Sequence, residues 1–155
     1  MSWLSSIFKR KQPALTTGRI LTPKQLCDGV GYPVISSDAA YAEVSSQWLR
    51  SYYEDFREVL FREGVTGYDN RFDCDDFGLM YIGLANMRYY RAAWHSDSAA
   101  QSLALGEFWY ITAAGQSHAV VVAFTERGRL FIEPQTGREL SLTPSEVVSA
   151  YLVKF

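Results

Sequence analysis

Apolar residues recur at every third or fourth position through much of the first half of the chain, which is typical of helices with one buried face. The first such stripe follows Asp38, a residue suited to cap a helix, and ends before Gly64. The second starts just after Cys74. We therefore predict two core-facing helices, with Cys74 in the first turn of the second. Their apolar positions are Tyr41, Val44, Trp48, Tyr52, Phe56, Val59 and Leu60, then Phe77, Met80, Tyr81, Leu84 and Met87.

Two shorter helices are predicted from their starting residues. Thr22 is a suitable cap and Pro23 fits the first helical position, so a helix over residues 21–26 is expected. Thr143 and Glu146 have the spacing of a capping box, which predicts a last helix that runs to about Tyr151.

The second half of the chain is rich in β-forming residues. Strands are predicted over residues 107–112, 118–125 and 130–133, with turns near Gly115 and Gly128. A polar stretch over residues 96–102 is expected to be a surface loop. Helices followed by strands predict an α+β fold, in which N-terminal helices pack on a C-terminal antiparallel sheet.

Length and composition support one domain. The chain has 155 residues, of which 48% are hydrophobic, and this is enough for one sizeable core. We expect a flexible or amphipathic lead over residues 1–20 and a single domain over residues 21–155. No apolar run reaches the roughly 18 residues that cross a bilayer, so no integral membrane segment is expected.

The charge balance and the cysteines exclude some classes of protein. With 15 basic and 17 acidic residues the net charge is −2, which gives no general attraction to nucleic acid. Cys27 and Cys74 lie in unlike contexts and do not suggest a disulfide framework. This favours a reducing compartment, and hence a cytoplasmic location.

The N-terminal residues 1–11 place apolar side chains before basic ones, which is the reverse of a secretory signal. As a helix they would gather Trp3, Leu4, Ile7 and Phe8 on one side. Such a segment could make weak contact with a membrane surface or a partner's groove. A frayed or locally packed terminus is the alternative.

Cys74 and His118 are candidates for thiol chemistry. The first turn of a helix stabilises a thiolate through its unpaired N–H groups and its dipole. His118 begins an apolar strand, where a polar residue needs a reason, and an imidazole could move the proton of the thiol. Each residue also has a plain structural interpretation, a small buried hydrophobe for Cys74 and a strand-edge residue for His118.

Glu133 is the candidate partner that orients the imidazole. If the last two predicted strands form a hairpin, His118 at the start of one lies beside Glu133 at the end of the other. A pairing centred between Thr125 and Glu126 would place the two directly opposite. A carboxylate would fix the tautomer and orientation of the ring. A solvated strand end before Pro134 is the alternative.

Three segments resemble one protein family. They are Asn70-Arg-Phe-Asp-Cys-Asp-Asp-Phe77, Gly115-Gln-Ser-His-Ala-Val-Val121 and Phe131-Ile-Glu-Pro-Gln-Thr-Gly137. They resemble motifs of the papain-like protease domain at the C-terminus of Marasmius oreades agglutinin, and of small phage and bacterial relatives. The resemblance implies a catalytic triad of Cys74, His118 and Glu133, a papain-like or transglutaminase-like fold and calcium-dependent proteolysis. It also implies a bacteriophage or prophage origin, and so the cytoplasm of a bacterial host. The chain has no room for a sugar-binding trefoil, so a lectin role is not carried over.

A calcium site is a further candidate. Asp75 and Asp76 suit a helix start, but as like charges they raise the pKa of the thiol beside them. A calcium ion held by Asp75, Asp76 and Gln135, with Asp73 and Glu133 nearby, would reverse that effect. Simple helix capping by these aspartates is the alternative. No organic cofactor is expected.

Asn70 is the candidate side-chain donor of an oxyanion hole, together with the Cys74 backbone N–H. Gln116 is a weaker candidate because it lies on the turn that carries the histidine. Asn70 would also suit a left-handed turn, and this alternative stays open.

The chemistry as a whole predicts a papain-like cysteine peptidase that hydrolyses a peptide or protein through a thioester. The alternatives are an amidase or acyltransferase on the same triad, and a non-catalytic interaction or virion-associated protein of the same fold. A zinc site from Cys74, His118 and carboxylates is weaker, since no paired cysteine or histidine spacing is present.

Overall fold

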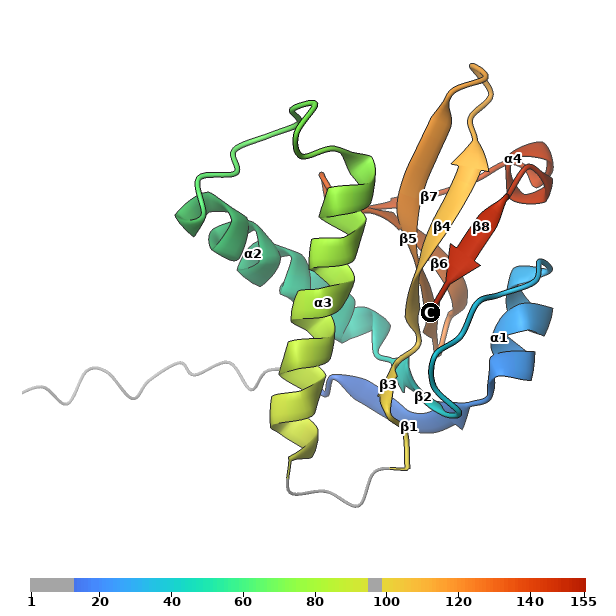
Figure 1. Cartoon of the computed structure of the whole chain (residues 1–155). Helices are drawn as coiled ribbons and strands as arrows, with labels where there is room; N and C mark the ends of the chain where they lie inside the picture. The colour runs from blue at the N-terminus through green and yellow to red at the C-terminus, as the bar shows by residue number, and fades with distance from the viewer. Residues whose placement is uncertain (1–12, 95–98) are drawn as a thin grey trace, which may run out of the picture.

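The computed structural model describes residues 13–94 and 99–155. Helices cover both faces of one sheet: α2 and α3 lie on one side and α1 and α4 on the other (Figure 1). The prediction of an α+β fold is confirmed, but the predicted C-terminal antiparallel sheet is wrong in two respects: the sheet contains parallel pairs, and it includes strands from the N-terminal part of the chain. In the described ranges the helices are α1 (Pro23–Val30), α2 (Ser46–Arg62), α3 (Cys74–Ala93) and α4 (Pro144–Val148).

The sheet has a central run of strands in the order β1-β2-β5-β4-β8. The short β3 pairs with β2, and β6 lies between β5 and β7. Strand β2 runs parallel to β3 and β5, whereas the other neighbours are antiparallel. The strands are β1 (Thr16–Leu21), β2 (Tyr41–Val44), β3 (Ser102–Leu103), β4 (Leu105–Ile111), β5 (Ser117–Thr125), β6 (Gly128–Glu133), β7 (Arg138–Leu140) and β8 (Leu152–Lys154).

The helices start where side chains cap them. Thr22 and Thr143 each form the expected capping box, and Pro23 is the first residue of α1. Asp73 caps α3, so Cys74 is its first residue as predicted. Helix α4 ends at Val148, earlier than expected, because the chain turns to form β8.

The predicted helix from Asp38 is wrong in its first turns. Residues Tyr41–Val44 form β2, in which all four side chains are buried, and α2 begins only after Ser45. Ser45 caps α2 by accepting the Trp48 N–H, whereas Asp38 accepts the hydroxyl of Ser102. In this segment, burial of the side chains between neighbouring strands therefore determines the structure, although the apolar residues have a helical spacing.

The N-terminal boundary also differs from the prediction. Strand β1 pairs with β2 and lies within the segment expected to be a loose lead. The predicted amphipathic segment over residues 1–11 lies outside the described residues. None of the described helices is long and apolar enough to cross a membrane.

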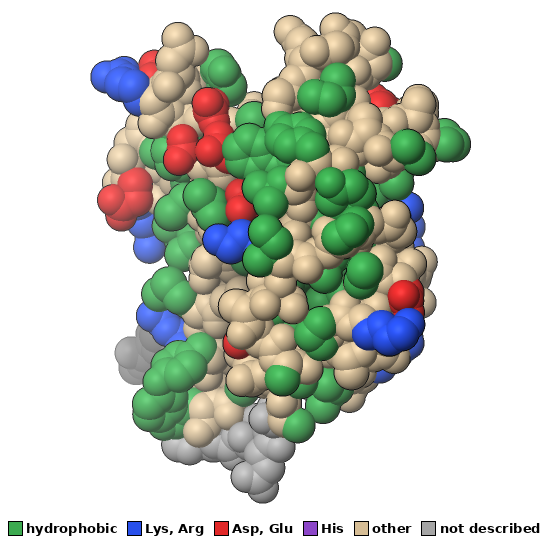
Figure 2. All heavy atoms as spheres, turned by 45° about the vertical axis from the view of Figure 1, so that its right-hand side comes forward, with side chains coloured by type: hydrophobic (Ala, Val, Ile, Leu, Met, Phe, Trp, Pro, Cys, Tyr) green, Lys and Arg blue, Asp and Glu red, His purple; other side chains and the backbone are tan. Residues whose placement is uncertain are grey.

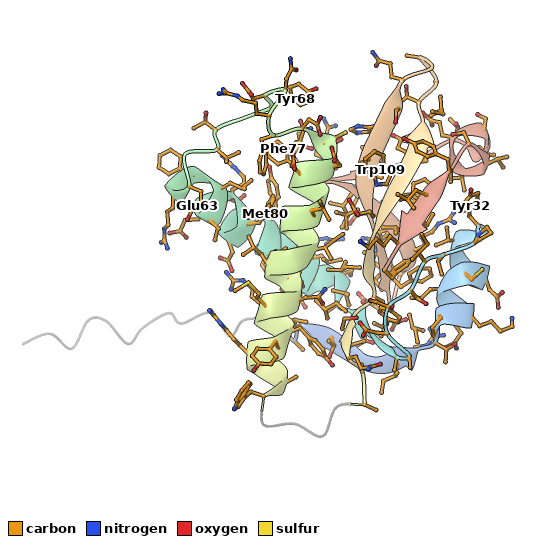
Figure 3. All side chains as sticks on the ribbon, in the orientation of Figure 1. Tyr32, Glu63, Tyr68, Phe77, Met80 and Trp109 are labelled. Atoms are coloured by element: carbon orange, nitrogen blue, oxygen red, sulfur yellow. The ribbon has the colours of Figure 1, made fainter. Side chains whose placement is uncertain are left out.

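Two apolar clusters hold the layers together. The larger one fills the space between the α2–α3 pair and the sheet, and there the rings of Tyr52 and Tyr81 meet edge to face with centroids 4.9 Å apart. Phe77 and Met80 extend from α3 into this layer (Figure 3). The smaller cluster, around Phe108 and Val120, lies on the other face of the sheet. The N-terminal end of α3 is thereby held against β5.

Candidate functional site

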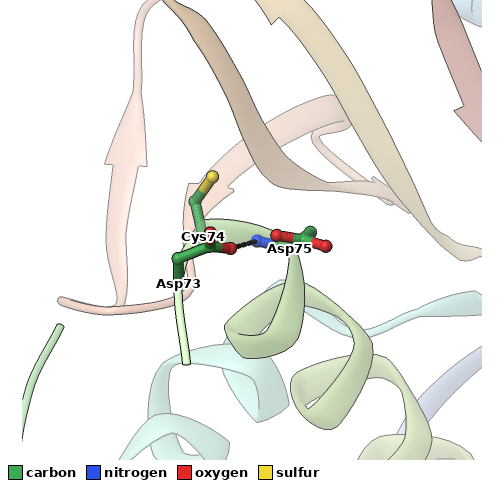
Figure 4. A group of neighbouring side chains, drawn as sticks. All are labelled: Asp73, Cys74 and Asp75. Carbon is green, nitrogen blue, oxygen red and sulfur yellow. Dashed lines mark hydrogen bonds between the residues drawn. The ribbon is translucent and has the colours of Figure 1, made fainter. Parts of the chain in front are cut away.

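Cys74 lies at the N-terminal end of α3, between two aspartates (Figure 4). Asp73 accepts the backbone N–H of Asp75 at 3.4 Å, and its own N–H donates to Asp76 at 3.2 Å. These bonds satisfy N–H groups that a helix start leaves free. They fix Cys74 as the first residue of the helix.

The second part of the site is the pair of His118 and Glu133, whose Nε2 and Oε2 atoms lie 2.8 Å apart. Both side chains are about four-fifths buried. The pairing of Val121 with Ile132 places Glu133 opposite Val120, two residues from His118. The predicted proximity of His118 and Glu133 is confirmed, and the pairing differs by two residues from the one that would place them directly opposite. Because side chains alternate along a strand, this even shift leaves both on the same face as diagonal neighbours.

Glu133 also fixes the segment that follows it. Its Oε1 accepts the backbone N–H of Gln135 at 3.2 Å, and its carbonyl oxygen accepts the N–H of Gly137 at 2.8 Å. From α2, the Tyr53 hydroxyl donates to the carbonyl oxygen of Gln135 at 2.7 Å. The turn that begins at Glu133 is thus held from two sides. Tyr53 is not among the residues that the sequence pattern singled out.

The environment of Cys74 disfavours its thiolate. Burial raises the pKa of the thiol first, and the charges of Asp73 and Asp75 raise it further. A hydrogen bond from the backbone of Ala119 acts in the opposite direction. The expected activation by the helix start is therefore outweighed.

Cys74 and His118 are not joined by a hydrogen bond in the described part of the chain. The Nε2 atom of His118 is engaged by Glu133, so only Nδ1 remains for another partner. The structure brings His118 and Glu133 into contact, and it places Cys74 near Ala119, the residue next to His118.

The acidic side chains beside Cys74 are close enough to hold a cation. One ligand atom each from Asp73, Cys74 and Asp75 lie within 4.8 Å of one another. A hydrogen bond with Asp73 raises the pKa of Asp75, as two crowded carboxyl groups would. Of the predicted calcium ligands, Asp76 caps the helix, and Gln135 belongs to the turn after Glu133.

Asn70 lies exposed in a tight turn closed by backbone bonds between Asp69 and Phe72. All described residues with positive φ are glycines, so the left-handed conformation considered for Asn70 is wrong. The donor role of Asn70 stays a prediction.

A groove lies beside the turn after Glu133. It has a volume of about 420 Å³, and we call it the Gln135 groove. One side is formed by Gln135 and Thr136, and the other by Tyr68 and neighbouring residues of the loop between α2 and α3. Tyr68 is 62% exposed, which leaves its ring free for a ligand. The full lining is Arg57, Leu60, Phe61, Val65, Thr66, Gly67, Tyr68, Phe77, Gln135 and Thr136.

Two solved structures resemble this chain in fold. One is Polyporus squamosus lectin bound to the human-type influenza-binding epitope Neu5Aca2-6Galb1-4GlcNAc, with a TM-score of 0.61 and 18% identity over 88% of this chain. The other is described as a PSL1a–E64 complex, with a TM-score of 0.60 and the same identity and coverage. The chain spans 49% and 50% of those two chains, so about half of each. No family model and no curated protein matches the sequence.

These comparisons contradict the enzymatic prediction. The first of these structures is named as a lectin, which is a binding protein, and neither name states a peptidase. The assignment as a papain-like cysteine peptidase, hydrolase or thiol protease is therefore corrected, together with its amidase and acyltransferase alternatives. The physical weakness of that prediction was the thiol, whose pKa is raised rather than lowered. At this identity the likeness shows the fold alone.

Proposed function

We propose that the chain is a binding domain and that the Gln135 groove holds its ligand, a carbohydrate. The observation that carries this proposal is the fixed wall of the groove. Tyr53, His118 and Glu133 together hold the turn at Gln135 through hydrogen bonds of 2.7–3.2 Å. A wall that is ordered before the ligand arrives reduces the entropic cost of binding.

The lining of the groove suits a ligand rich in hydroxyl groups. Gln135, Thr136 and Arg57 offer side-chain donors, and the first two also offer acceptors. Tyr68 and Phe61 are both exposed and present apolar ring surface beside these polar groups. A concave site with aromatic walls and a few polar groups is the usual form of a small-ligand site.

The lectin descriptions of the similar structures support this class of ligand. The proposal departs from the sequence-based expectation that a lectin role is not carried over. It concerns the groove of this chain, which spans only half of the lectin chain, and the epitope of that lectin is one ligand to test.

For the fold itself we propose the papain-like type and a relationship to the C-terminal domain of Marasmius oreades agglutinin. This finer assignment rests on three features. A cysteine begins a helix that packs on a mostly antiparallel sheet, a histidine is the second residue of the facing strand, and a glutamate ends the next strand. In this fold the pair of His118 and Glu133 has a positioning role toward the groove.

Calcium is retained as a proposed cofactor. The hard oxygen ligands of Asp73 and Asp75 fit the ion, whereas the Cys74 sulfur does not. Two carboxylates fall short of the six to eight oxygen atoms that calcium takes, so backbone oxygens or water would complete the set. A bound ion would add positive charge beside the thiol and lower its pKa.

A glycan array that carries sialylated and unsialylated oligosaccharides tests the proposed function. We expect selective binding, followed by a Kd in the roughly micromolar to millimolar range by titration calorimetry. Tyr68→Ala and Gln135→Ala should each weaken binding by about tenfold, the effect of about 1.4 kcal/mol. Tyr90→Ala removes an equally exposed ring from the far part of α3 and should leave Kd unchanged.

The same experiments also define the results that would contradict the proposed carbohydrate site. If no oligosaccharide binds, or if Tyr68→Ala and Tyr90→Ala behave alike, the Gln135 groove is not a carbohydrate site. Cys74→Ala should retain binding, since the thiol does not line the groove.

A further inference from the structure

A second pocket lies between α3 and the edge of the sheet formed by β4 and β8, with a volume of about 270 Å³. We call it the Glu107 pocket. It shares no lining residue with the Gln135 groove. Its walls are largely apolar, with Leu79 and Ile82 on α3 and Leu105 and Phe155 on the other side.

A buried carboxylate faces this pocket. Glu107 is 7% exposed, and its Oε1 atom is buried without a hydrogen-bond partner. The nearby Trp109 indole N–H, which lies between α3 and the sheet (Figure 3), is also buried and unpartnered. Burial raises the pKa of Glu107 and outweighs the charge of Lys154 and the indole N–H of Trp109, which both act to lower it. A buried acceptor without a donor costs free energy, and a ligand that donates would recover it.

The charges around the pocket favour a cation. Asp38 lines the same pocket, and Asp75 is close enough for its charge to raise the pKa of Glu107. Lys154 is the cationic side chain of the lining, and its charge acts on Glu107, but within the described ranges it forms no ion pair with that carboxylate. Figure 2 shows acidic, basic and apolar side chains close together toward the upper left of the face that it presents.

From this arrangement we infer that the Glu107 pocket binds a small organic ammonium ion. Its N–H groups would donate to Glu107 Oε1, and its carbon chain would lie against Leu79 and Ile82. A charge-assisted hydrogen bond in a poorly solvated site is stronger than a neutral one. The inference concerns a different site from the proposed carbohydrate groove and stands without it.

A bare metal ion fits this pocket less well. Among the described residues, the acidic, cysteine and histidine side chains that gather within ligand distance are Asp73, Cys74 and Asp75, and Glu107 is not one of them. The two carboxylates of the lining, Glu107 and Asp38, do not by themselves supply the six to eight oxygen atoms of a hard cation such as calcium. The apolar walls of the pocket can cover an alkyl chain.

Titration of the full chain with n-pentylamine and, separately, with n-pentanol tests the inference. The two probes have nearly the same shape, and only the amine is cationic at neutral pH. We expect saturable shifts in the amide NMR spectrum for the amine, and binding at least about tenfold weaker for the alcohol. Equal affinity for the two probes would overturn the inference.

Two variants locate the site. Glu107→Gln keeps the shape and removes the charge, so binding of n-pentylamine should weaken by about tenfold or more. Gly83→Leu should abolish binding of n-pentylamine. Gly83 lines the pocket and a side chain there meets open space, so the leucine would fill the room that the amine needs. Glu63→Gln, an exposed acid at the end of α2, is the control and should bind as the wild type does. Unchanged binding in both pocket variants would place the amine elsewhere and refute the assignment.

Discussion

Cys74 combines a helix-start position with neighbours that oppose its ionisation. The free N–H groups of a helix start stabilise a thiolate, but those of Asp75 and Asp76 are already used by the side chain of Asp73. Burial and the two flanking carboxylates then raise the pKa of the thiol. At this residue, the local charges decide the outcome rather than the helix dipole.

Alkylation of Cys74 measures this balance. Because its pKa is raised, the thiol stays protonated at neutral pH, and the rate of reaction with iodoacetamide should keep increasing above pH 9. Asp75→Asn removes one raising charge, so the rate at pH 8 should increase. Mass spectrometry can follow both cysteines at once, and Cys27, which lies in α1 on the other side of the sheet (Figure 1), serves as the internal reference. A slower reaction in the variant would contradict the assigned cause.

The same measurement tests the proposed calcium ion. A cation held by Asp73 and Asp75 would lower the pKa of the thiol, so millimolar calcium should accelerate alkylation of Cys74 in the wild type. The acceleration should vanish in Asp75→Asn. Equal rates with and without calcium in the wild type would remove the ion from the site.

At the residue scale, the sequence predicted which side chains lie close together better than it predicted how their pKa values change. The proximity of His118 and Glu133 followed from the hairpin between two recognisable strands, even though the pairing differs by two residues from the one that would place them directly opposite. The sign of the pKa change at Cys74 did not follow, because it depends on burial that only the packed structure defines. The fixing of Gln135 by Tyr53 joins residues 82 positions apart, and no local pattern indicates it.

At the scale of elements, the turn between β6 and β7 determines the shape of the Gln135 groove. Gly137 adopts a φ of +70°, and a Cβ atom there would lie 2.3 Å from the ring of Tyr53. The turn can therefore approach α2 only because position 137 has no side chain. The close approach also allows the Tyr53 hydroxyl to reach Gln135.

Gly137→Ala tests the role of this turn. We expect the free energy of unfolding to decrease by roughly 2–4 kcal/mol, about 1 for the positive φ and the rest for the overlap with Tyr53. Carbohydrate binding should weaken as well, since the wall of the groove would move. Urea denaturation followed by tryptophan fluorescence gives the stability.

Gly128→Ala is the matched control for that change. Gly128 also has a positive φ, of +91°, but a Cβ atom there meets nothing within 4 Å. Its cost should be only about 1 kcal/mol. Equal destabilisation by the two variants would show that contact with Tyr53 has no effect at position 137.

Elements with strong local signals were predicted well. Capping residues located the starts of α1 and α4, apolar spacing located the start of α3, and glycine turns located the hairpins of β4, β5 and β6. Strand β2 was predicted as helix because Tyr41 and Val44 continue the spacing of the following helix. Its identity is set by β1, β3 and β5, which lie far away in the sequence.

At the scale of the whole molecule, fold and function have to be argued separately. The layers around the sheet resemble half of a lectin chain at 18% identity, and this supports the architecture. A fold carries many functions, so the ligand must be argued from the site. The sequence motifs located the site residues but led to a catalytic interpretation that the lectin structures contradict.

The Gln135 groove and the Glu107 pocket lie on different parts of the molecular surface. The Gln135 groove lies by the loop between α2 and α3, and the Glu107 pocket lies between α3 and the sheet edge. Helix α3 contributes to both, through Phe77 to the first and through Leu79 and Ile82 to the second. An amide NMR titration can therefore distinguish ligands at the two sites, because each site should shift the signals of different α3 residues.

The most direct test of the central claim is an amide NMR titration of the full chain with the oligosaccharide that binds best on the array. The proposed binding domain predicts saturable shifts at Tyr68, Gln135 and Thr136, with no change around Glu107. Shifts confined to other surfaces, or no shifts at millimolar oligosaccharide, would contradict it.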